Sequence, residues 1–257
     1  MTDHTWNNPP TNWQPTANRI DVWRTTIDHD TTALDHCYAN LITSDERKRA
    51  DQFRISNRRN EFILGRAMVR HVLGKSLACD PITVTLTFEA KGKPFLEPAV
   101  NVNCVEFNLS HSHGLLLLAV TQTNPIGVDV EKMRVKTDCT KLATRYFSKN
   151  EVAALNQVPA KNQREAFFNC WTRKEAFLKA TGKGISFGLD QFDVAFWPTA
   201  DARLLATRFD ESEAANWAMA NIPIDSGYAA SVCIKADSQA DNSLDIARWA
   251  WQCNALS

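Results

Sequence analysis

Two acidic residues in a short apolar run are the first candidates for chemistry. The run reads Gly127-Val128-Asp129-Val130-Glu131. Alternate residues of a strand share a face, so Asp129 and Glu131 point the same way while the valines point into the core. Two neighbouring carboxylates repel each other unless a cation joins them, and hard oxygen ligands suit Mg²⁺. The alternative is a strand with a solvated acidic face, because a D-x-E pattern alone is common.

A helical run from Trp171 to Lys179 supplies the second candidate site. On a helix, Trp171 and Glu175 share one face with Phe168 and Leu178. An acidic residue on that face must reach the edge of the core or bind something, and Lys179, one turn later, reaches the same place. The alternative is an exposed Glu–Lys pair that contributes roughly a few tenths of a kcal/mol.

A serine and a histidine stand side by side where a strand runs into a polar turn. Ser110 and His111 lie within the stretch F-N-L-S-H-S-H-G at residues 107–114. Short donors at such a turn suit an anion. A Ser–His pair also suggests nucleophilic hydrolysis, but adjacent residues rarely form the hydrogen bond of a triad, and no G-x-S-x-G motif is present. A plain polar β-turn is the remaining alternative.

Basic residues are dense in the first half of a chain that has 29 basic and 29 acidic residues and no net charge. A zero net charge gives no general case for nucleic acid or for an anionic membrane as partner. A local patch can still bind phosphate groups, and solvated helix faces are the alternative. The residues concerned are Arg47, Lys48, Arg49, Arg58, Arg59, Arg66, Arg70, Lys91 and Lys93.

Taken together, these residues indicate chemistry on a phosphate ester or a pyrophosphate. Asp129, Glu131 and Glu175 provide three carboxylates for a divalent metal. The basic first half and the Ser110–His111 turn provide donors for phosphate oxygens.

Helices and strands are predicted in an α+β order that occurs twice along the chain. We expect a Ser-capped helix from Ser44 and another helix led by the capping box Ser148-x-x-Glu151. Long helices are predicted over residues 58–73, with Gly74 as the C-cap, and 164–180, ending at Gly182. Strands are predicted over residues 20–23, 83–88, 105–109, 115–120, 126–130, 192–196, 216–222 and 228–234.

The repeated order predicts two halves, residues 1–124 and 125–257, with a boundary near Asn124-Pro125. Each half would be a small antiparallel sheet packed with a long helix. A chain of 257 residues that is 44% hydrophobic and 23% charged can bury such cores.

Seven cysteines lie far apart, without a C-x-x-C pair or a zinc spacing. We expect isolated, buried, reduced thiols, which favours the cytosol. Residues 1–20 lack the basic and apolar regions of a signal peptide, and the longest apolar run, residues 115–120, is too short to span a membrane. The sequence thus predicts a soluble intracellular protein.

Five motifs in fixed order resemble one known family, the 4′-phosphopantetheinyl transferases of the surfactin-synthetase-activating (Sfp) type. The resemblance covers about residues 20–234. The motifs are G-K-P-F-L at 92–96, F-N-L-S-H-S at 107–112, P-I-G-V-D-V-E-K at 125–132, R-Y-F-S-K-N-E at 145–151 and W-T-R-K-E-A-F-L-K-A-T-G-K-G-I at 171–185.

The resemblance implies two similar α+β halves related by a pseudo-twofold axis. It implies transfer of the phosphopantetheine arm of coenzyme A to a serine of an apo carrier protein, with release of adenosine 3′,5′-bisphosphate. Carriers of fatty-acid, polyketide and nonribosomal-peptide biosynthesis are all possible partners. The resemblance also implies a monomer, a cytoplasmic setting and Mg²⁺ as the cofactor.

By the same resemblance, Asp129, Glu131 and Glu175 would hold Mg²⁺ with the pyrophosphate of coenzyme A, which Lys179 would contact. Glu175 would also take the proton of the serine, although a metal-bound carboxylate is a poor base. Four further residues would bind coenzyme A: Ser110 and His111 its phosphates, and Lys93 and Arg49 its adenosine and 3′-phosphate end.

Two other functions stay open. One is a non-catalytic homologue that binds a carrier protein or a nucleotide. The other is a Mg²⁺-dependent phosphodiesterase, although such enzymes commonly use two metal ions and more ligands than these motifs supply.

Overall fold

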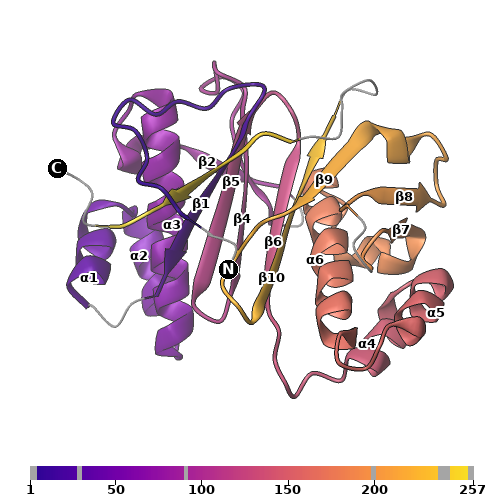
Figure 1. Cartoon of the computed structure of the whole chain (residues 1–257). Coiled ribbons are helices and arrows are strands. Elements are labelled where there is room, and N and C mark those ends of the chain that lie inside the picture. The colour runs from indigo at the N-terminus through magenta and orange to yellow at the C-terminus, as the bar shows by residue number, and fades with distance from the viewer. Residues whose placement is uncertain (1–4, 28–30, 90–91, 198–200, 237–243, 254–257) are drawn as a thin grey trace. The chain divides into compact units, whose positions relative to one another are not determined.

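A computed structural model describes residues 5–27, 31–89, 92–197, 201–236 and 244–253 (Figure 1). The chain forms two compact units. The first, here called the N-terminal unit, contains residues 5–123 and 245–257, and the second, the C-terminal unit, contains residues 124–244. The described C-terminal segment 245–253 therefore belongs to the first unit, whereas the sequence analysis assigned it to the second half.

A four-stranded sheet forms the centre of the N-terminal unit, in the order β11-β1-β5-β4. Its strands are β1 (Ile20–Thr26), β4 (Val105–Ser112), β5 (Leu115–Gln122) and β11 (Ile246–Ala250). The sheet is mixed, because β11 runs parallel to β1 while β5 pairs antiparallel with both β1 and β4. The apolar run of β5 is buried up to its last residue, as expected for a central strand.

Three helices accompany this sheet: α1 (Thr31–Asn40), α2 (Ser44–Asp51) and α3 (Ser56–Leu77). The cap of α2 is Thr43, one residue before the predicted Ser44, and it forms a capping box with Glu46.

Gly74 is not the C-cap that the sequence predicted, because α3 continues to Leu77 and ends at Ala78 with a φ of 52°. A Cβ at Gly74 would lie 2.9 Å from the carbonyl oxygen of Cys79. The glycine thus allows a close approach of the chain and does not end the helix.

The strand predicted over residues 83–88 forms only in its second half. A 3₁₀ helix, η1 (Pro81–Thr83), precedes that half, because Asp80 accepts from the backbone N–H of Ile82. Only β2 (Leu86–Phe88) remains, and it pairs with β3 (Pro94–Leu96) in a two-stranded sheet.

The C-terminal unit is built on a three-stranded antiparallel sheet in the order β6-β10-β9. The long helix α6 packs against β6 and β10 (Figure 1). The bounds are β6 (Ile126–Lys132), β9 (Trp217–Asn221), β10 (Tyr228–Lys235) and α6 (Gln163–Thr181).

The other elements of this unit are shorter. They are α4 (Cys139–Tyr146), α5 (Lys149–Gln157), the paired strands β7 (Phe192–Val194) and β8 (Leu204–Thr207), and the 3₁₀ helices η2 (Ile185–Phe187), η3 (Leu189–Gln191) and η4 (Glu213–Asn216). The predicted capping box is confirmed, because Ser148 and Glu151 cap each other at the start of α5. The end of α6 is confirmed at Gly182, whose φ is 68°.

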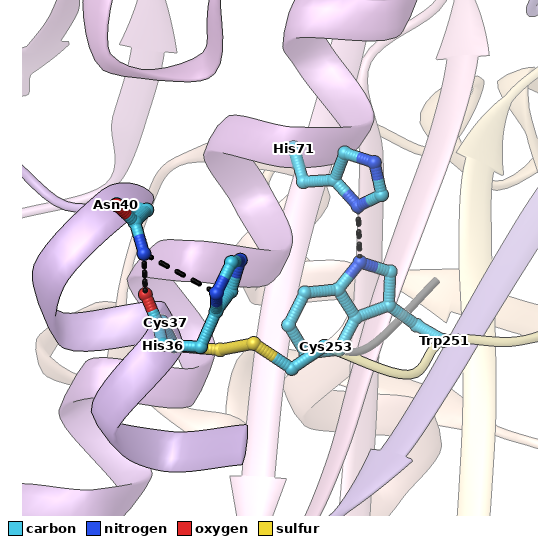
Figure 2. The surroundings of a disulfide bond; sticks show 6 residues. All are labelled: His36, Cys37, Asn40, His71, Trp251 and Cys253. Carbon is cyan, nitrogen blue, oxygen red and sulfur yellow. Dashed lines mark hydrogen bonds between the residues drawn. A yellow bond between two sulfur atoms is a disulfide. The ribbon is translucent and has the colours of Figure 1, made fainter. Parts of the chain in front are cut away.

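Two of the seven cysteines form a disulfide, which corrects the expectation of reduced thiols. Cys37 of α1 and Cys253 are bonded, with their Cα atoms 6.4 Å apart (Figure 2). Burial also differs from expectation, because Cys79 and Cys104 are exposed. In the described part of the chain, no helix is both long and apolar enough to cross a membrane.

Candidate functional site: a carboxylate–lysine cluster and a separate polar strand

Strand β6 and helix α6 bring the predicted acidic residues of the C-terminal unit together. Asp129 is 4% exposed and Glu175 is 7% exposed, while Glu131 is half-buried. The Lys179 ammonium donates to Asp129 Oδ1 at 2.7 Å and to the carbonyl oxygen of Val128 at 3.1 Å. The burial of Asp129 excludes the alternative of a solvated acidic strand face, and the burial of Glu175 excludes the alternative of an exposed Glu–Lys pair on the helix.

Gly127 is the residue that lets α6 lie so close to β6. A Cβ at this position would overlap the carbonyl oxygen of Ala176 and the amide nitrogen of Ala180. Along one edge β6 pairs with β10, where Asp129 stands opposite Ser231. The glycine therefore sets the short distance across which Lys179 reaches Asp129.

The electrostatics of the cluster centre on Glu175. Burial is the main cause that raises the pKa of Glu175 to about 7, and the negative charges of Asp129 and Glu131 raise it further against the opposing charge of Lys179. Glu175 Oε1 is buried and accepts no hydrogen bond from the described residues. A buried carboxylate oxygen without a donor is unfavourable unless a proton or a cation reaches it.

The chemistry of these donors fits a hard divalent cation. All three groups, Asp129, Glu131 and Glu175, are carboxylates close enough to affect one another's charge, and one of their buried oxygens lacks a donor. As the side chains stand, no group of three His, Cys, Asp or Glu residues among those described is arranged to hold a metal ion. In this structure the Lys179 ammonium supplies positive charge at Asp129.

Charged residues that the sequence analysis did not single out anchor α6. The Lys174 ammonium is fully buried, lies 2.7 Å from Glu151 Oε2, and donates to the carbonyl oxygen of Leu189 at 2.7 Å. On the neighbouring position, Arg173 donates to Asn221 Oδ1 at 3.0 Å. The motif W-T-R-K-E at residues 171–175 held a signal for these anchoring contacts, because it places Arg173 and Lys174 on a predicted helix among aromatic residues.

Ser110 and His111 lie on strand β4 and not in a turn. The turn is formed two residues later by His113 and Gly114, whose φ values are 49° and 83°. Ser110 is buried and His111 is exposed, as expected for neighbours on opposite faces of a strand. His111 Nδ1 lies 3.6 Å from Glu61 Oε2. Because the two side chains point apart, they do not form a nucleophile–base pair.

The two predicted contacts for the adenosine end differ in their surroundings. Lys93 precedes β3 and is half-buried, and this burial lowers the pKa of Lys93 while the charges of Glu106 and Glu89 raise it. Glu106 belongs to β4, so Lys93 and Ser110 are associated with the same strand. Arg49 is exposed on α2 and donates to Gln52 Oε1 at 3.1 Å.

Several of the basic residues expected to form a patch are instead structural. Arg47 donates to the carbonyl oxygens of Tyr38, Ala39 and Ile42. Arg70 is buried and donates to Glu46 Oε2 at 2.6 Å and to the carbonyl oxygen of Val84 at 2.7 Å. These guanidinium groups are engaged in holding the helices of the N-terminal unit.

Comparison with known proteins gives matches over both units. Residues 125–233 match the family model described as the 4′-phosphopantetheinyl transferase superfamily, and residues 11–123 match that of the 4′-phosphopantetheinyl transferase N-terminal region. The chain is 35% identical over 234 residues to the 4′-phosphopantetheinyl transferase HetI of Nostoc sp., covering 91% of this chain and 95% of that protein.

Two Bacillus proteins are also similar. The 4′-phosphopantetheinyl transferase psf-1 of Bacillus pumilus is 31% identical over 79% of this chain and 82% of its own length. The 4′-phosphopantetheinyl transferase Sfp of Bacillus subtilis is 30% identical over 61% of this chain and 67% of its own length.

Proposed function

The chain belongs to the 4′-phosphopantetheinyl transferase superfamily, and on that premise we propose that it moves the phosphopantetheine arm of coenzyme A to a serine of an apo carrier protein. The observation that carries the proposal is the cluster of Asp129, Glu131, Glu175 and Lys179. Its buried carboxylates, the donor-free oxygen of Glu175 and one lysine together suit a metal-bound pyrophosphate.

The proposed reaction is a single displacement at phosphorus. The serine oxygen of the carrier bonds to the phosphorus that bears the pantetheine, and the bond from that phosphorus to the bridging oxygen of the pyrophosphate breaks. The leaving group is adenosine 3′,5′-bisphosphate. The serine proton passes to a base, and the chain itself forms no covalent intermediate.

Asp129, Glu131 and Glu175 are the residues that would hold Mg²⁺. When bound, the ion supplies neutralisation of the pyrophosphate charge. Lys179 would donate to the pyrophosphate oxygens, and its ammonium lies beside the carboxylates that would hold the metal, 2.7 Å from Asp129 Oδ1. Glu175 is the candidate base for the serine proton, because its buried carboxylate stands beside Asp129 and Lys179 and its Oε1 accepts no hydrogen bond from the described residues.

In the N-terminal unit we assign the phosphates of coenzyme A to Ser110 and His111, and its adenosine end to Lys93 and Arg49. The exposed His111 and Arg49 are accessible to a ligand. Lys93 lies near the charge of Glu106, and Glu106 and Ser110 both belong to β4. The carrier class, the monomeric state and the cytoplasmic setting stay predictions.

The test is incubation with coenzyme A, Mg²⁺ and an apo carrier protein, read by the intact mass of the carrier. We expect a carrier that gains one phosphopantetheine and a reaction that stops when the divalent cation is chelated. A chain that binds the carrier without changing its mass would be a non-catalytic homologue. Cleavage of coenzyme A without transfer would indicate a phosphodiesterase. Fatty-acid, polyketide and peptide carriers tested side by side identify the class of partner.

Glu175→Gln separates a catalytic role of this residue from a structural one. The amide keeps an oxygen for the metal but cannot accept a proton, so turnover should fall by roughly 10²-fold or more at every pH. Coenzyme A binding, measured by calorimetry, should survive. Normal turnover in this variant would remove Glu175 as the base.

A further inference from the structure

The C-terminal arm, defined here as residues 245–253, lies at the edge of the N-terminal sheet. Its strand β11 pairs in parallel with β1 over five residue pairs, from Ile20 with Ile246 to Arg24 with Ala250. On its other side, Asn7 donates to the carbonyl oxygen of Arg248 at 3.0 Å and accepts from the N–H of Ala250 at 2.8 Å. The arm is thus enclosed between β1 and the segment around Asn7.

Two tryptophans fix the arm through their indole N–H groups. Trp249 donates to Asp21 Oδ1 at 2.7 Å, and Trp251 donates to His71 Nδ1 at 2.7 Å. Figure 2 shows Trp251 reaching His71 of α3 beside the disulfide. Trp251 is only 3% exposed, so this part of the arm completes the hydrophobic core of the N-terminal unit.

A disulfide bond links the arm to helix α1. Cys253 bonds to Cys37 of α1 across a separation of 216 residues, as Figure 2 shows. A crosslink over so long a stretch removes much of the entropy that the arm would gain on detaching and unfolding.

We propose that the Cys37–Cys253 pair is a redox-controlled clasp that holds the C-terminal arm on β1 and α1. A dithiol reductant opens the clasp. Its thiolate attacks one sulfur, the S–S bond breaks, and the two electrons and two protons of the dithiol leave Cys37 and Cys253 as thiols while the reductant becomes a disulfide. The arm is then held by its non-covalent contacts with β1, the segment around Asn7 and α3, which can open without breaking a covalent bond.

The burial of the Cys37–Cys253 bond determines how a reductant can reach it. Cys37 is 0% and Cys253 is 5% exposed, so a reductant must wait until the arm opens locally. Opening is favoured at this site because all five residues of β11 are partly exposed. A cavity of about 420 Å³ also lies beside the bond, lined among others by Leu34, Trp251 and Cys253.

The test uses the full chain, first oxidised with oxidised glutathione and then treated with dithiothreitol. Peptide mapping without reduction should recover Cys37 and Cys253 as one linked pair. In hydrogen exchange, amides of β11 should exchange at least tenfold faster after reduction, while amides of α6 keep their rates. Cys37→Ser should exchange rapidly in both conditions. Cys79→Ser, which removes an exposed free thiol, should behave as the unaltered chain does.

Three results would overturn the clasp. The first is that both thiols stay free in oxidised glutathione. The second is equal exchange of β11 in the oxidised and reduced chains. The third is reduction that proceeds only as fast as the whole chain unfolds, which would make the bond a permanent staple. Reduction at the rate of β11 opening supports the proposal. None of these measurements depends on transferase activity.

Discussion

At the scale of the residue, Lys179 is the side chain whose role is most directly testable. We expect Lys179→Ala to lower turnover by roughly 10²-fold, because a cation placed at a developing charge contributes mainly in the transition state. The loss of the ammonium also leaves Asp129 buried beside Glu175 without its cation, so the free energy of unfolding should fall by about 1–3 kcal/mol.

Steady-state kinetics and urea unfolding measure the two effects of Lys179→Ala. Lys149→Ala is the matched control, because Lys149 is an exposed lysine at the start of another helix, α5, of the same unit. Lys179→Arg should recover part of the turnover, since it keeps the charge. Turnover in Lys179→Ala that equals the Lys149→Ala control would exclude a role for this lysine in transfer.

His71 makes the stability of the N-terminal unit depend on pH. Burial, with a smaller effect of the Lys75 charge, lowers the pKa of His71 to about 4, and its Nδ1 accepts from Trp251. As pH falls from about 6.5 to 4, the unfolded chain binds a proton at this histidine and the folded chain does not. The free energy of unfolding should therefore fall by an amount on the order of 2–3 kcal/mol across that interval.

The variant His71→Asn keeps an acceptor for the Trp251 indole but does not titrate in this range. Urea unfolding at about pH 7 and about pH 4.5 should show a smaller loss of stability on acidification in the variant than in the unaltered chain. An unchanged loss would mean that other groups cause the acid sensitivity.

At the scale of the element, Gly127 decides whether β6 and α6 can form the site. Gly127→Ala adds a methyl group that overlaps backbone atoms of Ala176 and Ala180, and backbone cannot move aside as a side chain can. We expect a loss of roughly 2–4 kcal/mol in the free energy of unfolding and a large loss of turnover, because α6 carries Glu175 and Lys179.

The matched control is Gly65→Ala in α3, where the added Cβ would lie 3.1 Å from a terminal carbon of the Leu109 side chain. A side chain can shift, and alanine favours a helix over glycine by about 1 kcal/mol, so this variant should be nearly neutral. Thermal unfolding of the two variants compares them directly. Equal stability of both would mean that the β6–α6 contact tolerates separation.

Elements with local signals were predictable from the sequence. The capping box at Ser148 and the glycine at 182 are read from neighbouring residues, and the structure confirms both. Gly74 and Ser44 were misassigned for a different reason. Gly74 is required because the chain after α3 passes close to it, and not because the helix ends there. The N-cap of α2 is Thr43, one position before Ser44. The sequence patterns around Asp129, Glu175 and Lys179 predicted that these residues share one site. Their burial was not predictable, because it depends on how β6 and α6, which are distant in the sequence, pack together.

In the chain as a whole, the segments that form β1 and β11 are joined by contacts that no sequence pattern predicted. β11 pairs with β1 across more than 220 positions, and no local pattern links such distant segments. The odd number of cysteines and their wide spacing likewise concealed the Cys37–Cys253 bond, because pairing is set by the fold and not by sequence distance. The sequence prediction therefore assigned residues 245–253 to a different unit from the one in which they lie.

Deletion of residues 245–257 tests how much of the N-terminal unit depends on its arm. The deletion removes the β11 ladder, the buried Trp251 and the disulfide together. Cys253→Ser removes the disulfide alone and should lower the free energy of unfolding of the oxidised chain by about 2–4 kcal/mol. The deletion should cost about 2–3 kcal/mol more, because it also exposes the surface that Trp251 covers.

Urea unfolding of the oxidised proteins measures both losses, and hydrogen exchange shows where they occur. In the deleted chain we expect faster exchange in β1, which loses its neighbour β11, and unchanged exchange in β6 and α6 of the other unit. Equal losses in the deletion and in Cys253→Ser would mean that the bond alone stabilises the arm. Faster exchange throughout β6 and α6 would show that the two units unfold as one, and the stability of the carboxylate–lysine cluster would then depend on an arm that contributes no residue to it.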